Sequence, residues 1–371
     1  MDQCELFFTV VDESPDSFAQ DPLSSSSSIP FDRVTGVTVR LRHGPFMASL
    51  YVCVKVLTAS VLLTAITYVI ITIKMTIPLG HPKISWSFLW SNFFRDDDLD
   101  MNRTSYLPFN YTVNIEDLCF EKANPAPIEL LVLVATAPRN VQLRDAVRET
   151  WGRDLKSSPQ NKVAFVLGRT TKPALERSIR KELLLHSDII QADFIDTYNN
   201  LTIKSVAMLR WACMYCPQAQ FVAKLDDDTF LNVPNFLKVI KFLPRNAIYG
   251  KLFNHTKPIR DQQSPWRTSY KEYPAEYYPD LISGTCYVIG GDVLRLLYKA
   301  TGTQPAFRLE DVLVTGLSAE SVGIPRVGVP GFNSVPVETV CEMRDQLTSH
   351  YMTPKAMLDY YKALKQPELK C

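Results

Sequence analysis

The chain has 371 residues, of which 46% are hydrophobic and 21% are charged, and its formal net charge is +1. This length accommodates one large domain or two ordinary ones. A net charge so close to zero gives no indication of a nucleic-acid partner. Eight cysteines are present, but their spacing does not match a zinc site. The single CxxC, formed by Cys213 and Cys216, is interpreted as structural.

The N-terminal third contains a candidate membrane anchor. Residues 1–45 are polar and include the serine run Ser24–Ser28, which predicts a disordered cytoplasmic tail. Residues 46–74 contain an uncharged apolar segment, Val56–Ile73, long enough to span a membrane. A cleaved signal peptide would lie nearer the N-terminus, so we expect an uncleaved signal anchor, with a buried core helix as the alternative. Residues 75–125 contain several prolines and predict a luminal stem.

Glycosylation motifs indicate the orientation of this anchor. All four Asn-X-Thr motifs follow the apolar segment, and they begin at Asn102, Asn110, Asn200 and Asn254. Their position predicts a luminal C-terminal part, in agreement with the positive charges that precede the segment. Disulfides would be permitted there, with the pairing left open, among Cys119, Cys213, Cys216, Cys286, Cys341 and Cys371.

Residues 126–371 are predicted to form a compact α/β domain. Apolar runs that predict strands alternate with segments that predict helices. The predicted strands lie at 128–135, 162–167, 189–194 and 221–225. The predicted helices between them lie at 143–151, 174–186 and 202–213. Such alternation is typical of a largely parallel sheet with right-handed crossovers. Farther along, 277–291 predicts a turn, a loop and a strand, and 292–299 predicts a helix.

Two acidic groups are candidates for chemistry. Asp226, Asp227 and Asp228 follow a predicted buried strand, at the end where α/β sheets bind ligands. A hard cation such as Mg²⁺ or Mn²⁺ would relieve their mutual repulsion and could hold a diphosphate, whereas the alternative is a solvated acidic turn. Glu310 and Asp311 begin a predicted helix, where the alternative role is simple capping.

Six motifs occur in one order between Leu130 and Tyr361. They are Pro138–Gly152 (PRNVQLRDAVRETWG), Phe165–Gly168 (FVLG), Asp188–Lys204 (DIIQADFIDTYNNLTIK), Lys224–Asn232 (KLDDDTFLN), Tyr278–Val288 (YPDLISGTCYV) and Glu310–Val312 (EDV). In this order they resemble the β-1,3-glycosyltransferases of glycosyltransferase family 31, which include β-1,3-galactosyltransferases and β-1,3-N-acetylglucosaminyltransferases.

The resemblance implies a fold and an activity. The fold would be the GT-A nucleotide-diphospho-sugar transferase type, with a mostly parallel central sheet behind a single N-terminal transmembrane helix. The protein would be a type II Golgi membrane hexosyltransferase. It would move galactose or an N-acetylhexosamine from a UDP-sugar to an acceptor glycan on a glycoprotein or glycolipid, in β-1,3 linkage and with inversion. The cofactor would be Mn²⁺ or Mg²⁺, and homodimerisation is left open.

By the same resemblance, the Asp cluster Asp226–Asp228 would bind the metal and the donor. Asp228 is the first metal ligand, Asp226 is a further ligand, and His350 would complete the site, with a surface histidine as the alternative. Asp226 and Asp227 would contact the ribose or the waters of the metal. Further donor contacts are assigned to Asp196, Lys204, Arg144 and Arg148.

Arg144 and Arg148 lie one turn apart on a predicted helix and could bind the diphosphate; the alternative is a solvated helix face. Asp311 would be the base that deprotonates the acceptor hydroxyl, with Glu310 as its neighbour. Trp151, Trp211 and Tyr198 are interpreted as core aromatics rather than sugar platforms.

Several positions depart from the family pattern. Leu143 replaces an arginine, Ile282 stands where the family usually has cysteine, and Cys286 replaces a small residue. Thr315 adds one residue before Gly316. The departures at Leu143, Ile282 and Cys286 motivate an alternative, a membrane-anchored carbohydrate-binding protein that has lost catalysis on the same fold. A glycosidase with paired carboxylates is a third hypothesis, but it would not need the Asp cluster.

Overall fold

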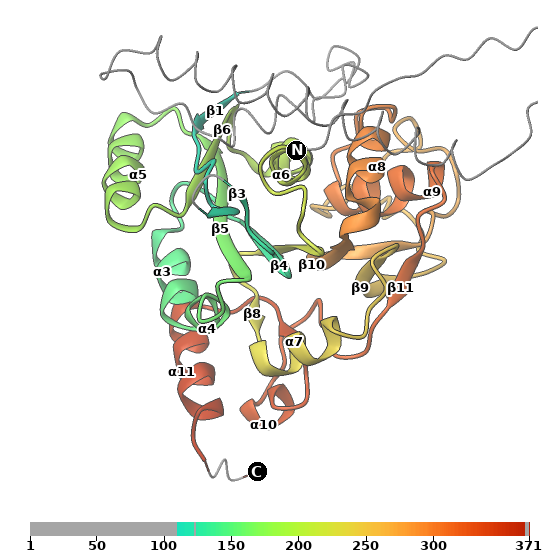
Figure 1. Ribbon diagram of the computed structural model, residues 1–371. Coiled ribbons are helices and arrows are strands. Elements are labelled where there is room, and N and C mark those ends of the chain that lie inside the picture. Colours follow the sequence, from blue (N-terminus) through green and yellow to red (C-terminus); the bar gives the residue numbers. More distant parts are fainter. Residues whose placement is uncertain (1–109, 122–123, 368–370) are drawn as a thin grey trace, which may run out of the picture. The chain divides into compact units, whose positions relative to one another are not determined.

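The computed structural model describes residues 110–121, 124–367 and 371 (Figure 1). The predicted tail and anchor, most of the predicted stem, and Asn102 lie outside these residues. Within the described ranges, no helix has both the length and the apolar character needed to cross a membrane.

A mixed eight-stranded sheet forms the centre of the domain, in the order β1-β6-β5-β4-β7-β10-β9-β11. Its strands are β1 (Tyr111–Val113), β4 (Leu130–Ala135), β5 (Asn161–Arg169), β6 (Ile189–Ile195), β7 (Phe221–Asp226), β9 (Ile248–Phe253), β10 (Leu281–Gly290) and β11 (Arg326–Gly328). The neighbours β6, β5, β4 and β7 run parallel, as the sequence predicted. At one flank β1 pairs antiparallel with β6, and at the other β10 pairs antiparallel with β7 and with β9. The prediction of a largely parallel sheet therefore holds for the centre of the sheet and not for these outer pairs.

Helices cover both faces of the sheet. They are α3 (Val141–Glu149), α4 (Trp151–Leu155), α5 (Pro173–His186), α6 (Leu201–Tyr215), α7 (Val233–Ile240), α8 (Gly291–Thr301), α9 (Ala319–Ser321), α10 (Val340–Met343) and α11 (Pro354–Leu364), with a 3₁₀ turn η1 (Tyr198–Asn200) and a π-helix η2 (Val312–Ser318). Figure 1 shows α6 and α8 on one side of the sheet and α4 and α7 on the other. The predicted helix 143–151 is interrupted at Thr150, whose backbone leaves the helical conformation.

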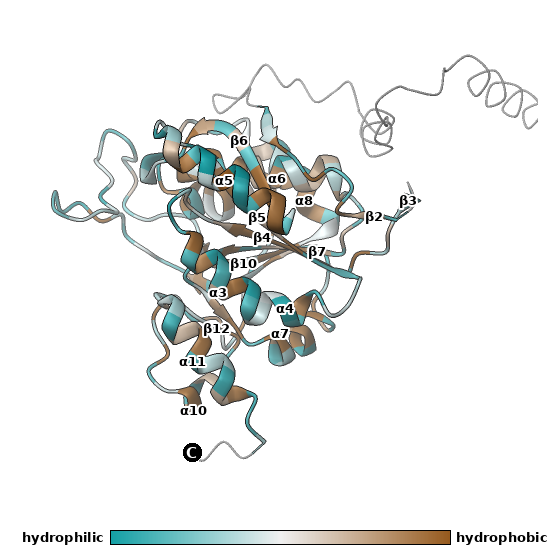
Figure 2. Ribbon diagram, turned by 90° about the vertical axis from the view of Figure 1, so that its left-hand side faces the viewer, coloured by the Kyte–Doolittle hydropathy of each residue, from teal (hydrophilic) through white to brown (hydrophobic). Residues whose placement is uncertain are grey.

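The apolar side chains of β4 pack into two hydrophobic cores, because successive residues of a strand face opposite sides of the sheet. Leu131 and Leu133 pack into the core that includes residues of α6 and α8. Val132 and Val134 pack into the core that includes residues of α3, α4 and α7. Figure 2 shows these central strands as hydrophobic ribbons between helices with mixed surfaces. Burial on both faces therefore explains the continuous apolar sequence.

Short strands and disulfides complete the domain. Strand β8 (Phe230–Leu231) pairs antiparallel with β12 (Thr348–Ser349), and β2 (Phe120–Glu121) pairs with β3 (Asn124–Pro125). Among the described cysteines, disulfides join Cys119 to Cys216 and Cys341 to Cys371, whereas Cys213 and Cys286 are free. The CxxC cysteines are thus not bonded to each other, since Cys216 pairs with a residue 97 positions away.

Candidate active site

The carboxyl ends of β4 and β7 meet at one edge of the sheet. Their parallel pairing places Ala135 beside Asp226, and the antiparallel strand β10 begins close to the same edge. A cleft of about 810 Å³ opens there. Its walls include residues from the Asp motif, from the Glu310–Asp311 pair and from the C-terminal segment around His350. Segments far apart in the sequence therefore contribute to one site.

Asp226, Asp228 and His350 form a candidate metal site. Their ligand atoms all lie within 4.8 Å of one another, and Nε2 of His350 is 3.1 Å from Oδ1 of Asp228. The pairing of β8 with β12 brings them together, because Ser349 lies opposite Phe230 and the next residue is His350. Two carboxylates and an imidazole form a donor set that fits Mn²⁺, so the residues present are suitable for the implied ion.

Asp227 faces the same cleft but is more deeply buried than its neighbours. Its Oδ2 accepts hydrogen bonds from the Thr136 hydroxyl at 2.6 Å and from the Asn140 amide at 2.9 Å. Burial raises the pKa of Asp227, although these two hydrogen bonds oppose the increase. These hydrogen bonds therefore connect the loop after β4 to the Asp cluster.

Asp311 is held at the start of η2 by backbone donors. Its side chain accepts hydrogen bonds from the Val312 N–H at 2.9 Å and from the Gly284 N–H at 3.3 Å. Burial raises the pKa of Asp311, while these backbone N–H groups act in the opposite direction. The Val312 contact is the capping predicted as the alternative, and the same side chain also lines the cleft, so it can cap the helix and face a ligand.

Glu310 is buried behind Asp311 beside a lysine. Its Oε1 lies 2.9 Å from Nζ of Lys224, and its Oε2 accepts a hydrogen bond from the Tyr287 hydroxyl at 3.3 Å. Burial raises the pKa of Glu310 to about 6; Lys224 opposes this shift and the charge of Asp311 adds to it. A Cβ at position 284 would lie only 2.5 Å from Oε1 of Glu310, so close approach of the carboxylate requires Gly284.

Asp196 and Lys204 meet at another wall of the cleft. The ammonium of Lys204 donates to the Thr136 carbonyl at 2.5 Å and to Asp196 at 3.0 Å. Asp196 also accepts a hydrogen bond from the Gly168 N–H at 2.7 Å. Both residues line the cleft, although they are paired with each other and almost fully buried, so their contact with the donor stays a prediction.

Arg144 and Arg148 are not part of the cleft. Arg144 is fully buried and forms an ion pair with Glu182 at 2.6 Å, while Arg148 pairs with Glu182 at 2.7 Å and with Asp188 at 2.8 Å. The prediction that they contact a diphosphate is wrong, because their guanidinium groups are engaged inside the fold. The alternative of a solvated helix face is wrong for the same reason.

Arg139 is the arginine of this motif that reaches the cleft. Its side chain is exposed and lines the cavity. Among the described residues, no hydrogen bond or ion pair engages its guanidinium. Its position directly after Pro138, in the loop that follows β4, is the sequence feature that indicates this role. Helical spacing instead favours Arg144 and Arg148.

Aromatic side chains surround the mouth of the cleft. Tyr198, Trp266 and Tyr351 line it with 54%, 47% and 55% of their surfaces exposed. The assignment of Tyr198 to the core is therefore wrong, whereas Trp151 and Trp211 are buried as predicted. No sequence pattern indicates Trp266, because it lies in an irregular segment without periodicity.

The glycosylation motifs differ in accessibility. Asn110 and Asn254 are exposed. Asn200 is half-buried, and its amide donates to the Ile195 carbonyl at 2.8 Å. The hydroxyl of Thr202, in the same motif, is buried and donates to the Phe307 carbonyl at 2.7 Å. The Asn200 motif thus also supports the fold close to the cleft.

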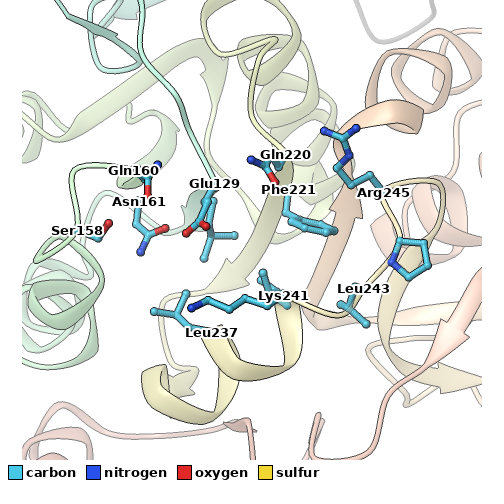
Figure 3. Close-up of a pocket in the computed structure, with 13 residues that line it drawn as sticks. Glu129, Ser158, Gln160, Asn161, Gln220, Phe221, Leu237, Lys241, Leu243 and Arg245 are labelled. Carbon is cyan, nitrogen blue, oxygen red and sulfur yellow. The ribbon is translucent and has the colours of Figure 1, made fainter.

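A second hollow, of about 610 Å³, lies at the opposite edge of the sheet (Figure 3). Phe221, at the start of β7, contributes to its wall, whereas the Asp motif follows the other end of that strand. Figure 3 shows Asn161 and Glu129 facing Leu237 and Lys241 across this hollow. None of the candidate catalytic residues lines it.

Comparison with known proteins defines the class as a glycosyltransferase. The sequence profile of the family described as Galactosyltransferase matches residues 142–330. The β-1,3-galactosyltransferase 1 of Mus musculus is 32% identical over 317 residues, which cover 84% of this chain and 95% of that protein. The β-1,3-galactosyltransferase 5 of Homo sapiens is 36% identical over 249 residues, which cover 64% and 79%. The chain belongs to the galactosyltransferase family, as its motifs indicated.

Similarity to solved structures is weaker. The galactosyltransferase LgtC in complex with donor and acceptor sugar analogs matches with a TM-score of 0.33 and 11% identity, over 64% of this chain and 97% of that chain. A glycosyltransferase involved in glycosylation of the major capsid of PBCV-1 matches with a TM-score of 0.37 and 14% identity, over 63% and 98%. Similarities at this level carry no argument about function.

Proposed function

We propose that the protein is an inverting β-1,3-hexosyltransferase with a GT-A fold, which transfers a sugar from a UDP-sugar to a hydroxyl of an acceptor glycan. The observation that carries this proposal is that the Asp226–Asp228–His350 cluster and Asp311 line one cleft. The names of the relatives favour galactose as the sugar, with an N-acetylhexosamine as the alternative.

The donor would bind along the wall formed by the Asp motif. Asp226, Asp228 and His350 would hold Mn²⁺, which when bound neutralises negative charge on the diphosphate leaving group. Arg139 would contact the diphosphate through its exposed guanidinium. Asp196 and Lys204 would contribute to the nucleotide side of the same cleft.

Asp311 would act as the base. It would take the proton from the acceptor hydroxyl while that oxygen forms a bond to C1 of the sugar and the bond from C1 to the diphosphate breaks. UDP would then leave. A carboxylate whose pKa is raised by burial is a stronger proton acceptor, provided that it is ionised at the working pH. The exposed ring of Trp266 would pack against the acceptor.

The cellular setting is also a proposal. The apolar segment Val56–Ile73 and the four Asn-X-Thr motifs support a type II Golgi membrane protein whose transferase domain is luminal and glycosylated. A binding protein without catalysis is less well supported. The candidate base and the candidate metal ligands are all present, and they converge on one cleft.

A donor screen tests the proposed function. The full-length chain, purified in detergent, would be given UDP-galactose, UDP-N-acetylglucosamine, UDP-N-acetylgalactosamine or UDP-glucose, with β-glycoside acceptors and with or without Mn²⁺. We expect transfer that depends on Mn²⁺, selects one donor and disappears in Asp311→Asn. Asp345→Asn, at an exposed position, is the matched control. Glycan binding by a folded chain without transfer from any donor would favour the binding-protein alternative.

A further inference from the structure

A π-helix follows Asp311. This stretch, η2, covers Val312–Ser318 and includes Thr315, the residue that by resemblance lengthens the EDVxxG spacing of the family. A π-helix has one residue more per hydrogen-bonded turn than an α-helix, so it can accommodate an insertion without shifting both ends of the helix. The extra residue therefore lies one turn away from the candidate base.

The hydroxyl of Thr315 connects this helix to β10. It accepts the backbone N–H of Ile282 at 2.9 Å. It can donate its proton to the carbonyl of Asp311 at 2.7 Å or to the carbonyl of Ile282 at 2.9 Å. Thr315 is fully buried, so water does not compete for these groups. One hydroxyl thus connects the backbone of Asp311, the candidate base, to the backbone of Ile282 near the start of β10.

The same strand supplies a donor to the carboxylate. Gly284, two residues after Ile282, donates its N–H to Oδ2 of Asp311. The carbonyl of Gly284 also accepts a hydrogen bond from Lys224. Displacement of β10 at Ile282 would therefore change the surroundings of the Asp311 carboxylate.

We propose that Thr315 is a positioning residue for the base of the transfer reaction: its hydroxyl locks β10 against η2 and so holds the Gly284 N–H on the Asp311 carboxylate. This inference rests on the proposed function. It assigns a role to a buried residue that does not line the cleft.

The test compares Thr315→Val with Thr315→Ser in the full-length enzyme, with the donor and acceptor used by the wild type. Valine keeps the shape and removes the hydroxyl, whereas serine keeps the hydroxyl. We expect kcat to fall by about 10- to 100-fold in Thr315→Val, because a displaced base loses correct geometry. The KM for the UDP-sugar should remain unchanged, and Thr315→Ser should recover most of kcat.

The pH profile separates positioning from general stability. Loss of the Gly284 hydrogen bond should raise the pKa of Asp311, so the acid limb of the kcat profile should move to higher pH in Thr315→Val. Thr301→Val is the matched control, since Thr301 is also buried and its hydroxyl donates to a backbone carbonyl at 2.7 Å, but it lies in α8. Thermal unfolding would establish that each variant is folded at the assay temperature.

The outcomes are distinguishable. Transfer by the wild type with an unchanged kcat and pH profile in Thr315→Val would overturn this inference and leave the proposed function standing. Equal losses in Thr315→Val and Thr315→Ser would also overturn it. Absence of transfer by the wild type with every donor would overturn the proposed function, and this inference with it.

Discussion

Nζ of Lys224 lies 2.9 Å from Oε1 of Glu310, and both side chains are buried. The same ammonium is 2.6 Å from Asp226, a candidate metal ligand. Burial by itself would lower the pKa of Lys224, but the charges of Asp226 and Glu310 outweigh this effect and raise the pKa well above its ordinary value. The ammonium of Lys224 therefore connects the candidate metal ligand Asp226 to Glu310, the neighbour of the candidate base.

Replacing this cation should leave Glu310 as a buried, uncompensated charge. We expect Lys224→Met to destabilise the domain by about 3 kcal/mol near neutral pH, as removal of one partner of a buried ion pair typically does. The second substitution Glu310→Gln should restore part of the loss, because it removes the unpaired charge. Thermal unfolding of the single and double variants measures this coupling. Lys251→Met, at an exposed position, should have little effect.

The pKa of Glu310 predicts a pH dependence of stability. Its ordinary value is 4.5 and its folded value is about 6. Below pH 4.5 the group is protonated in both states. Between pH 4.5 and 6 the unfolded chain releases the proton first, so stability falls as the pH rises. The wild type should therefore lose on the order of 2 kcal/mol relative to Glu310→Gln across this window. Measuring the free energy of unfolding of both proteins at several pH values tests this prediction. If the two free energies changed in parallel with pH, the raised pKa assigned to Glu310 would be contradicted.

Loss of a metal ligand should weaken binding of the cation. We expect His350→Ala and Asp228→Asn to raise the Mn²⁺ concentration for half-maximal activity by at least about 10-fold. Calorimetric titration of Mn²⁺ measures the same loss without requiring turnover. Asp345→Asn is the control. Unchanged Mn²⁺ binding in both cleft variants would place the metal elsewhere.

Arg139 and Arg144, which both lie in the motif Pro138–Gly152, are expected to have different roles. Arg139→Ala should raise the KM for the UDP-sugar by about 10-fold and leave the unfolding midpoint unchanged, because it removes an exposed cation of the cleft. Arg144→Met should do the reverse, with an unchanged donor KM and a loss of about 3 kcal/mol of stability, since Glu182 loses a buried partner. If Arg144→Met alone impaired donor binding, the structural role assigned to Arg144 would be incorrect.

The acceptor side should depend on Trp266. Arg308 holds its loop by donating to the Pro265 carbonyl at 2.9 Å and to the Arg267 carbonyl at 2.8 Å. Trp266→Ala should raise the acceptor KM by about 10-fold, in keeping with the loss of one aromatic contact, and leave the donor KM unchanged. Tyr270→Ala is the control, because Tyr270 is an exposed aromatic of the same loop that does not line the cleft. Equal effects of the two substitutions would argue against a specific contact.

The parallel centre of the fold could be predicted because its strands are continuous apolar runs that alternate with segments that predict helices. The antiparallel flank was harder to predict. Strands β9 and β10 are separated by a long irregular segment, and local patterns do not reveal which neighbour a strand selects. The interruption at Thr150 and the π-helix around Thr315 were likewise not predicted, since both depend on backbone conformations that periodicity does not encode.

The sequence by itself determined the family, the Asp cluster at the end of a buried strand and the acidic pair at a helix start, because each is a local pattern with a local physical cause. Only the tertiary structure decided which residues share the cleft. Pairing of β8 with β12 brings His350 to Asp228, although they are far apart in the chain. The packing of α3 buries Arg144, whereas Arg139 of the same motif lines the cleft. Such outcomes depend on long-range packing, which sequence spacing does not contain.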